Sequence, residues 1–170
     1  MRSHTYFCFT FHNGKSYIIK ELHKYDPQSY VQVEFAGTCN AMSKNLVKQC
    51  NGKFDSLKAV FMDIPKGRTI TEQRFVFIEN LLNCRIVTEN KHSDDNDVIE
   101  LDSNVHMVVI SNRPISYVIG HLSPDRFLTW TFTKAKNWTQ EGYNRGDVYD
   151  NFLEKMLDDN DYLGDKLPFL

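Results

Sequence analysis

Residues 5–22 read TYFCFTFHNGKSYIIKEL, and this stretch decides the fold. The aromatic run over 5–11 predicts a buried strand. It breaks at 12–14, and Lys15 begins a predicted helix that ends before Pro27, because proline cannot continue a helix. A strand, a turn with Gly-Lys-Ser and a helix follow in the order of a phosphate-binding loop. There, backbone N–H groups hold anionic oxygens, the lysine neutralises phosphates and the serine hydroxyl binds Mg²⁺.

The rest of the chain repeats the alternation of strands and helices. Apolar or alternating runs predict strands over 30–35, 57–63, 105–111 and 128–133, helices over 40–49 and 71–83, and a hairpin made by 85–88 and 98–101. This order predicts an α/β fold with a largely parallel central sheet, whose ligands bind at the carboxyl ends of the strands.

Three polar residues lie where a nucleotide-binding site at the strand ends would need them, and each residue could instead have an ordinary structural role. Asp63 ends an apolar strand, as a Mg²⁺-binding acid does, but a strand-end aspartate also makes turns. Asn112 ends the next apolar strand and is suited either to orient a water or to form a turn. Arg126 follows a turn and either reaches a neighbouring subunit's nucleotide or pairs with Asp125 at the surface.

Composition sets further bounds. With 170 residues and a net charge of −2, the chain has room for one ordinary core and no overall basic character for nucleic acid. Its cysteines, at 8, 39, 50 and 84, lack the close spacing of zinc ligands. The apolar run at the start is too short to span a bilayer. We therefore expect an intracellular protein with no membrane partner.

Four stretches together carry a resemblance to a known family: GKSYIIKEL, KAVFMDIPKG, VVISNRP and LSPDRF. In this order they resemble the superfamily 3 helicase domain of the replication-associated (Rep) proteins of circular single-stranded DNA viruses and plasmids. The resemblance implies a P-loop NTPase of AAA+-like, three-layer architecture over 5–135. The remaining 136–170 are expected to form an acidic, partly disordered tail with one short helix.

The same resemblance implies the residues of the site. The nucleotide phosphates would be bound by Asn13, Gly14, Lys15 and Ser16, with Mg²⁺ on Ser16 and Asp63. Hydrolysis of ATP would depend on Lys15, Asp63, Asn112 as sensor and Arg126 as arginine finger. At the tip of the hairpin, Lys91 and His92 would contact nucleic acid. The implied assembly is a homo-oligomeric ring on single-stranded DNA, in the host nucleus for a DNA-virus type and otherwise in the cytoplasm.

The sequence also departs from the family pattern. Phe9 stands where the loop's first glycine is expected, Lys66 where the family often has arginine, and no general base is assigned. The nicking endonuclease that usually precedes this domain is not recognised, so we expect a helicase-only fragment, a truncated gene product or an integrated remnant. Three functions stay open: an ATP-dependent DNA helicase, a degenerate non-catalytic binding or assembly module, and an RNA helicase of the same superfamily.

Overall fold

The central sheet is parallel throughout. The computed structural model describes residues 4–9, 15–90, 96–118 and 126–132. Within them, five strands form a sheet in the order β2-β3-β6-β1-β7, and every neighbouring pair is parallel. These strands are β1 (His4–Phe9), β2 (Tyr30–Gln32), β3 (Ala59–Asp63), β6 (His106–Ser111) and β7 (Phe127–Phe132). The predicted α/β fold with a largely parallel sheet is confirmed.

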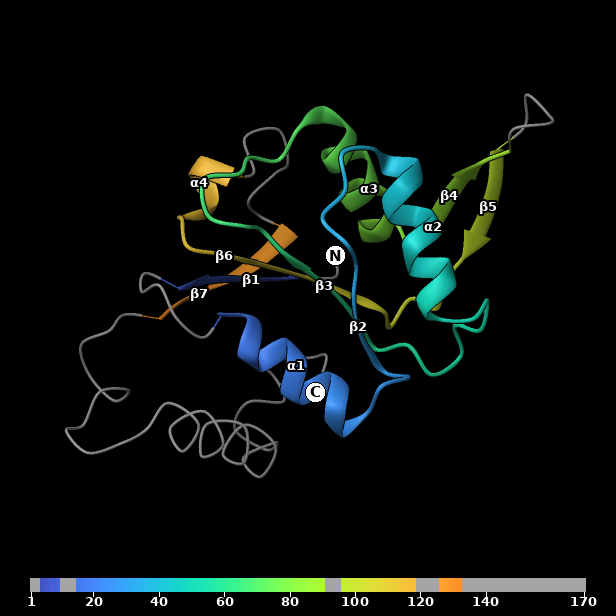
Figure 1. Cartoon of the computed structure of the whole chain (residues 1–170), viewed down its shortest axis with the longest axis horizontal. Coiled ribbons are helices and arrows are strands. Elements are labelled where there is room, and N and C mark those ends of the chain that lie inside the picture. The colour runs from blue at the N-terminus through green and yellow to red at the C-terminus, as the bar shows by residue number, and fades with distance from the viewer. Residues whose placement is uncertain (1–3, 10–14, 91–95, 119–125, 133–170) are drawn as a thin grey trace.

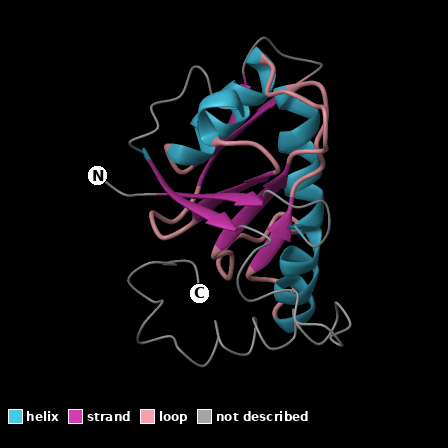
Figure 2. Ribbon diagram, turned by 90° about the vertical axis from the view of Figure 1, so that its left-hand side faces the viewer, coloured by secondary structure: helices cyan, strands magenta, loops and turns pink. Residues whose placement is uncertain are grey.

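Helices cover both faces of the sheet and make three layers (Figure 1). The longer helices are α1 (Lys15–Tyr25), α2 (Cys39–Gln49) and α3 (Glu72–Leu82). Because successive side chains of a strand point to opposite faces, Tyr6 and Met62 join the core under α2 and α3, while Phe7 and Phe61 face α1. Figure 2 shows the strands gathered between the helices after a quarter turn.

The predicted hairpin is also present. It consists of β4 (Arg85–Glu89) and β5 (Asn96–Glu100), an antiparallel pair separate from the main sheet. Ile86, only 1% exposed, belongs to the core that α2 and α3 share, and this anchors the hairpin's base. The far end projects beyond both helices (Figure 1).

Local signals explain where α2 begins and ends. The Thr38 hydroxyl accepts a hydrogen bond from the Ala41 N–H at 3.1 Å, which caps the helix. After Cys50, Asn51 and Gly52 both adopt positive φ angles, 52° and 70°, and turn the chain away. The predicted stop at this Asn-Gly pair is confirmed, since these two residue types tolerate that conformation best.

Two elements differ from expectation. β2 is shorter than predicted, although the Val33 N–H after it still donates to the Phe61 carbonyl of β3 at 2.9 Å. The Glu34 N–H is bound by the Asn45 side chain at 2.9 Å. A short helix, α4 (Ile115–Val118), follows Pro114 and was not predicted. The expected tail over 136–170 and its helix lie outside the described residues. Within the described part, none of the helices has the length and apolar character needed to cross a bilayer.

Candidate functional site

Asp63 and Asn112 lie at the carboxyl ends of two neighbouring strands, and we call this side of the sheet its carboxyl edge. Asp63 is the last residue of β3, and its register partner in β6 is Ile110, two positions before Asn112. The Ile64 N–H donates to the Ile110 carbonyl at 2.8 Å, so the two strands stay paired up to their ends. The structure therefore brings these two predicted site residues together.

β1, the strand that precedes the predicted phosphate-binding loop in the sequence, also ends here. β6 lies between β1 and β3, and Cys8 of β1 is the register partner of Ser111. The chain that follows Phe9 therefore starts beside the turn at Asn112, with Asp63 on the other side. Alternation along β3 places Asp63 on the same face as Phe61, which is the face that α1 covers.

The loop residues themselves are described only in part. Lys15 and Ser16 form the first turn of α1, as predicted. Their side chains, and the whole of Asn13 and Gly14, lie outside what the structure describes. The roles that the resemblance assigns to these four residues stay predictions.

Phe9 occupies a core position and is not part of a turn. It is the last residue of β1, is 1% exposed and is the register partner of Phe132. Its ring meets the Phe7 ring edge-on, with centroids 6.3 Å apart. The strand thus keeps its extended backbone through the position where the family pattern has a glycine.

Asn112 presents a buried acceptor. Its Oδ1 atom is inaccessible to solvent and accepts no hydrogen bond from any residue in the described ranges. Leaving a buried amide oxygen unsatisfied costs about 1–3 kcal/mol, so such an atom normally has a ligand or a water as partner. An oxygen with this unmet capacity is suited to accept a hydrogen bond from a water beside a bound phosphate.

The turn that carries Asn112 is fastened to β1 by a buried phenol. The Tyr6 hydroxyl donates to the Arg113 carbonyl at 2.5 Å, and the Arg113 N–H donates to Ser111 Oγ at 3.1 Å. Burial raises the pKa of Tyr6 to about 12, although a hydrogen bond with Ser111 acts in the opposite direction. The phenol is therefore neutral, and able to donate, at any physiological pH.

Arg126 is not part of this edge. It directly precedes β7, whose first residue, Phe127, pairs with His4 at the start of β1. That position is roughly 20 Å from Asn112 along the strands, at about 3.3 Å per residue. Its guanidinium donates instead to the Asn83 side chain at 3.4 Å. An arginine finger at Arg126 can therefore serve only a neighbouring subunit.

Arg74 joins two loops that follow the carboxyl ends of β2 and β3. Its guanidinium donates to the carbonyls of Ala36 and Thr69, both at 2.9 Å, and lies 3.9 Å above the Phe35 ring. Burial, and to a smaller degree the nearby Arg68, lowers the pKa of this side chain. The loop after β2 is thereby held against the loop that follows Asp63.

The hairpin offers little positive charge in its described part. Its arms carry Glu89, Asp97 and Glu100 against Arg85, and all four are exposed. Lys91 and His92, the predicted nucleic-acid contacts, lie outside the described residues. Because carboxylates repel a phosphate backbone, any contact would have to be made by the tip.

The described ranges contain no group of three or more His, Cys, Asp or Glu side chains placed to hold a metal ion. A metal site made entirely of protein side chains is therefore not found there. A Mg²⁺ ion bound with a nucleotide needs fewer protein ligands, because phosphate and water oxygens complete its shell. The assignment of Mg²⁺ to Asp63 and Ser16 stays a prediction, because the Ser16 side chain lies outside what the structure describes.

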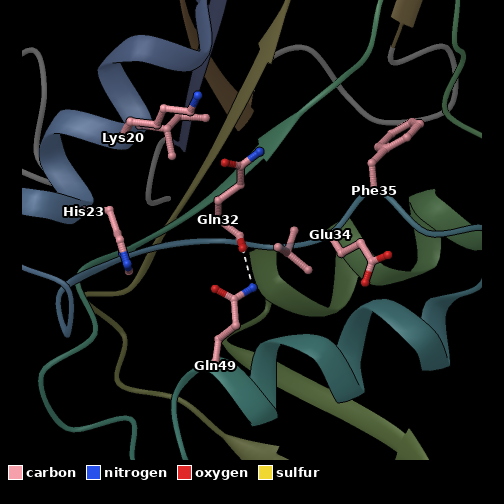
Figure 3. A pocket seen from close by; sticks show the side chains of 8 residues that line it. Lys20, His23, Gln32, Glu34, Phe35 and Gln49 are labelled. Atoms are coloured by element: carbon pink, nitrogen blue, oxygen red, sulfur yellow. Dashed lines mark hydrogen bonds between the residues drawn. The ribbon is translucent and has the colours of Figure 1, made fainter.

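A cavity of about 450 Å³ opens at the outer edge of β2, away from Asp63 and Asn112. Figure 3 shows its lining, with Gln49 of α2 reaching the backbone of Gln32. Gln49 Nε2 donates to the Gln32 carbonyl at 2.5 Å, and the Tyr30 carbonyl accepts from His23 Nδ1 at 2.7 Å. Side chains thus take the hydrogen-bonding places of a further strand and cover this sheet edge.

Sequence reasoning missed the contact between Tyr6 and the turn after β6. The two residues are far apart in sequence, and no local pattern joins them. One feature does single out Tyr6: it carries the only hydroxyl on an aromatic ring in a run whose other rings, at 7, 9 and 11, are phenylalanines. A lone phenol in a buried strand needs a partner for its proton.

Comparisons with known proteins leave the family open. No family model matches the chain, and no curated protein matches it. One solved structure that it is similar to is the apo A form of the NrS-1 C terminal region, CTR(305-718), with 16% identity and a TM-score of 0.45. The match covers 88% of this chain and 33% of that one, so the chain spans about a third of its length. A likeness this distant says nothing about activity.

Proposed function

We propose that this chain is the ATPase domain of a nucleic-acid helicase of the superfamily 3 type, acting in replication. The observation that carries the proposal is the strand order. Because β6 lies between β1 and β3, the turn with Asn112 lies between the end of β1, which precedes the predicted phosphate-binding loop in the sequence, and Asp63. A nucleotide bound at this edge would have an acid and an amide beside its phosphates, which is what hydrolysis by positioning and charge stabilisation requires.

Two of the described residues, Asp63 and Asn112, support the binding of a magnesium nucleotide. Asp63 lies on the α1 face, where the helix begins with Lys15 and Ser16. Asn112 adds a buried acceptor without a partner among the described residues. When bound, Mg²⁺ would neutralise charge on the phosphate oxygens. The chain's own part would be to hold the phosphates at the start of α1 and to orient a water through Asn112.

The proposed assembly is a ring of identical subunits. Arg126 supports it, since this side chain lies too far from Asn112 of its own chain to act there. In a ring it would stabilise charge on the nucleotide of the next subunit. Single-stranded DNA is the proposed track, and the hairpin tip with Lys91 and His92 is its proposed contact.

Hydrolysis is tested by measuring phosphate release from Mg·ATP by the parent, Asp63→Asn and Asn112→Ala. Glu72→Gln is the matched control, because Glu72 is an exposed carboxylate in the first turn of α3. We expect turnover in the parent and the control, and a loss of roughly 10²-fold or more in the two site variants. A parent that binds ATP without turning it over would instead favour the non-catalytic module. Stimulation by single-stranded RNA but not DNA would favour the RNA helicase.

A further inference from the structure

The turn after β6 is held by two side-chain hydrogen bonds to the backbone of Arg113. Tyr6 Oη contacts the Arg113 carbonyl at 2.5 Å, and the Arg113 N–H contacts Ser111 Oγ at 3.1 Å. The Tyr6 side chain is fully buried and Ser111 is 3% exposed, so the two hydroxyls that hold Arg113 belong to the core.

The direction of each bond follows from the chemistry of the groups. A carbonyl can only accept, so the phenol proton of Tyr6 is donated to Arg113. A backbone N–H can only donate, so Ser111 Oγ accepts from Arg113. Arg113 is thus held at its carbonyl by the phenol of β1 and at its N–H by the serine hydroxyl of β6.

Asn112 is the residue enclosed by these two bonds. Its neighbour on one side supplies the serine hydroxyl, and its neighbour on the other side has both its N–H and its carbonyl bound. The backbone on either side of Asn112 is therefore fixed relative to β1. The Asn112 oxygen remains buried, without a partner among the described residues.

We propose that Tyr6 is a positioning residue of the nucleotide site, which together with Ser111 fixes the turn that presents the Asn112 amide. The inference rests on the proposed function, because Asn112 is worth positioning only if a nucleotide binds at this edge. Packing alone does not require the hydroxyl, since a phenylalanine ring would fill the same space. When the group that orients an attacking water becomes mobile, the rate of hydrolysis falls.

The test compares Tyr6→Phe with Tyr30→Phe. Tyr30 is 2% exposed and sits on β2, so it is an equally buried phenol on a strand that does not contact the turn. For Tyr6→Phe we expect kcat for ATP to fall roughly tenfold while KM changes little, because one buried hydrogen bond is lost. Tyr30→Phe should keep the parent's kcat. Ser111→Ala should resemble Tyr6→Phe, and the double variant should be little worse than either, because the hydroxyls act as one unit.

A second readout does not depend on hydrolysis. In the free protein, the side-chain amide resonance of Asn112 should shift or broaden in Tyr6→Phe and stay in place in Tyr30→Phe. If the parent hydrolyses ATP and Tyr6→Phe matches Tyr30→Phe in both readouts, the positioning role is wrong while the proposed function stands. If the parent binds no nucleotide, the proposed function fails, and the positioning role fails with it even when the Asn112 resonance moves.

Discussion

Arg126 and Asn112 lie at opposite ends of the strands of the parallel sheet, Arg126 at an amino end and Asn112 at a carboxyl end. Arg126 donates to Asn83 at the edge where β7 begins, whereas Asn112 follows the last residue of β6. The separation is roughly 20 Å along the strands, well beyond the reach of an arginine side chain. If both residues serve one hydrolytic site, two subunits have to contribute to it.

A mixing experiment follows from this separation. Arg126→Ala and Asp63→Asn should each be inactive alone, the first for lack of a finger and the second for lack of the Mg²⁺-binding acid. In a mixture, some interfaces pair an intact Arg126 with an intact Asp63, so ATP turnover should return in part. The measurement is phosphate release against mixing ratio, with Glu72→Gln mixed into Asp63→Asn as the control for dilution. A mixture no more active than its two components would count against a shared site.

Tyr6 should make the protein sensitive to alkali. Its pKa is about 12 in the fold, against 10.0 ordinarily, because it is buried. The folded state therefore holds this proton more tightly than the unfolded state. The contribution to stability is complete below the unfolded pKa and is lost as pH rises through the folded one, about 2–3 kcal/mol in all.

The measurement is the free energy of unfolding at about pH 9 and about pH 12 for the parent and Tyr6→Phe. The parent should lose more stability over this window than the variant. Burial also raises the pKa of Tyr30, so its contribution cancels in the comparison. Tyr25→Phe, at an exposed tyrosine, serves as the control. Equal losses in parent and Tyr6→Phe would show that the phenol titrates freely in the fold.

Much of this fold can be predicted from the sequence, because the apolar runs that mark the strands also determine which residues lie at the strand ends. Apolar runs predicted every strand of the main sheet. Because the strands are parallel, Asp63 and Asn112 lie together at their carboxyl ends. The same logic places Arg126, which precedes a strand, at the opposite edge. The Tyr6 contact with Arg113 was not readable, since it depends on side-chain reach between segments far apart in the chain. α4 is too short to show periodicity. The bond from the Glu34 N–H to the Asn45 side chain was not readable either, because it joins two separate elements.

The planar guanidinium of Arg74 should stabilise the folded protein. It binds two carbonyls on different loops and covers the Phe35 ring, which the ammonium of lysine cannot do at once. Arg74→Lys should lower the free energy of unfolding by about 1–3 kcal/mol. Arg68→Lys, at an exposed arginine nearby, is the matched control. A denaturant titration that finds the two variants equally stable would remove this role for Arg74.

Side chains of α2 cover the outer edge of β2, and removing them should promote association between copies of the protein. Asn45 binds the Glu34 N–H and Gln49 binds the Gln32 carbonyl, so removing both side chains uncovers backbone groups of an edge strand. Asn45→Ala combined with Gln49→Ala should increase concentration-dependent association relative to the parent, as seen by light scattering. Lys48→Ala, on the same helix, should not. If the double variant scatters like the parent at every concentration, these amides do not protect the edge.

The central claim is that the carboxyl edge of the sheet binds a magnesium nucleotide, and calorimetric titration of the chain with Mg·ATP tests it most directly. Lys15→Ala is the site variant, and Lys20→Ala, at an exposed lysine one helix turn further along α1, is the control. The proposed site predicts saturable binding to the parent and to Lys20→Ala, and its loss in Lys15→Ala. Absence of heat in all three proteins, or equal binding by Lys15→Ala, would contradict it.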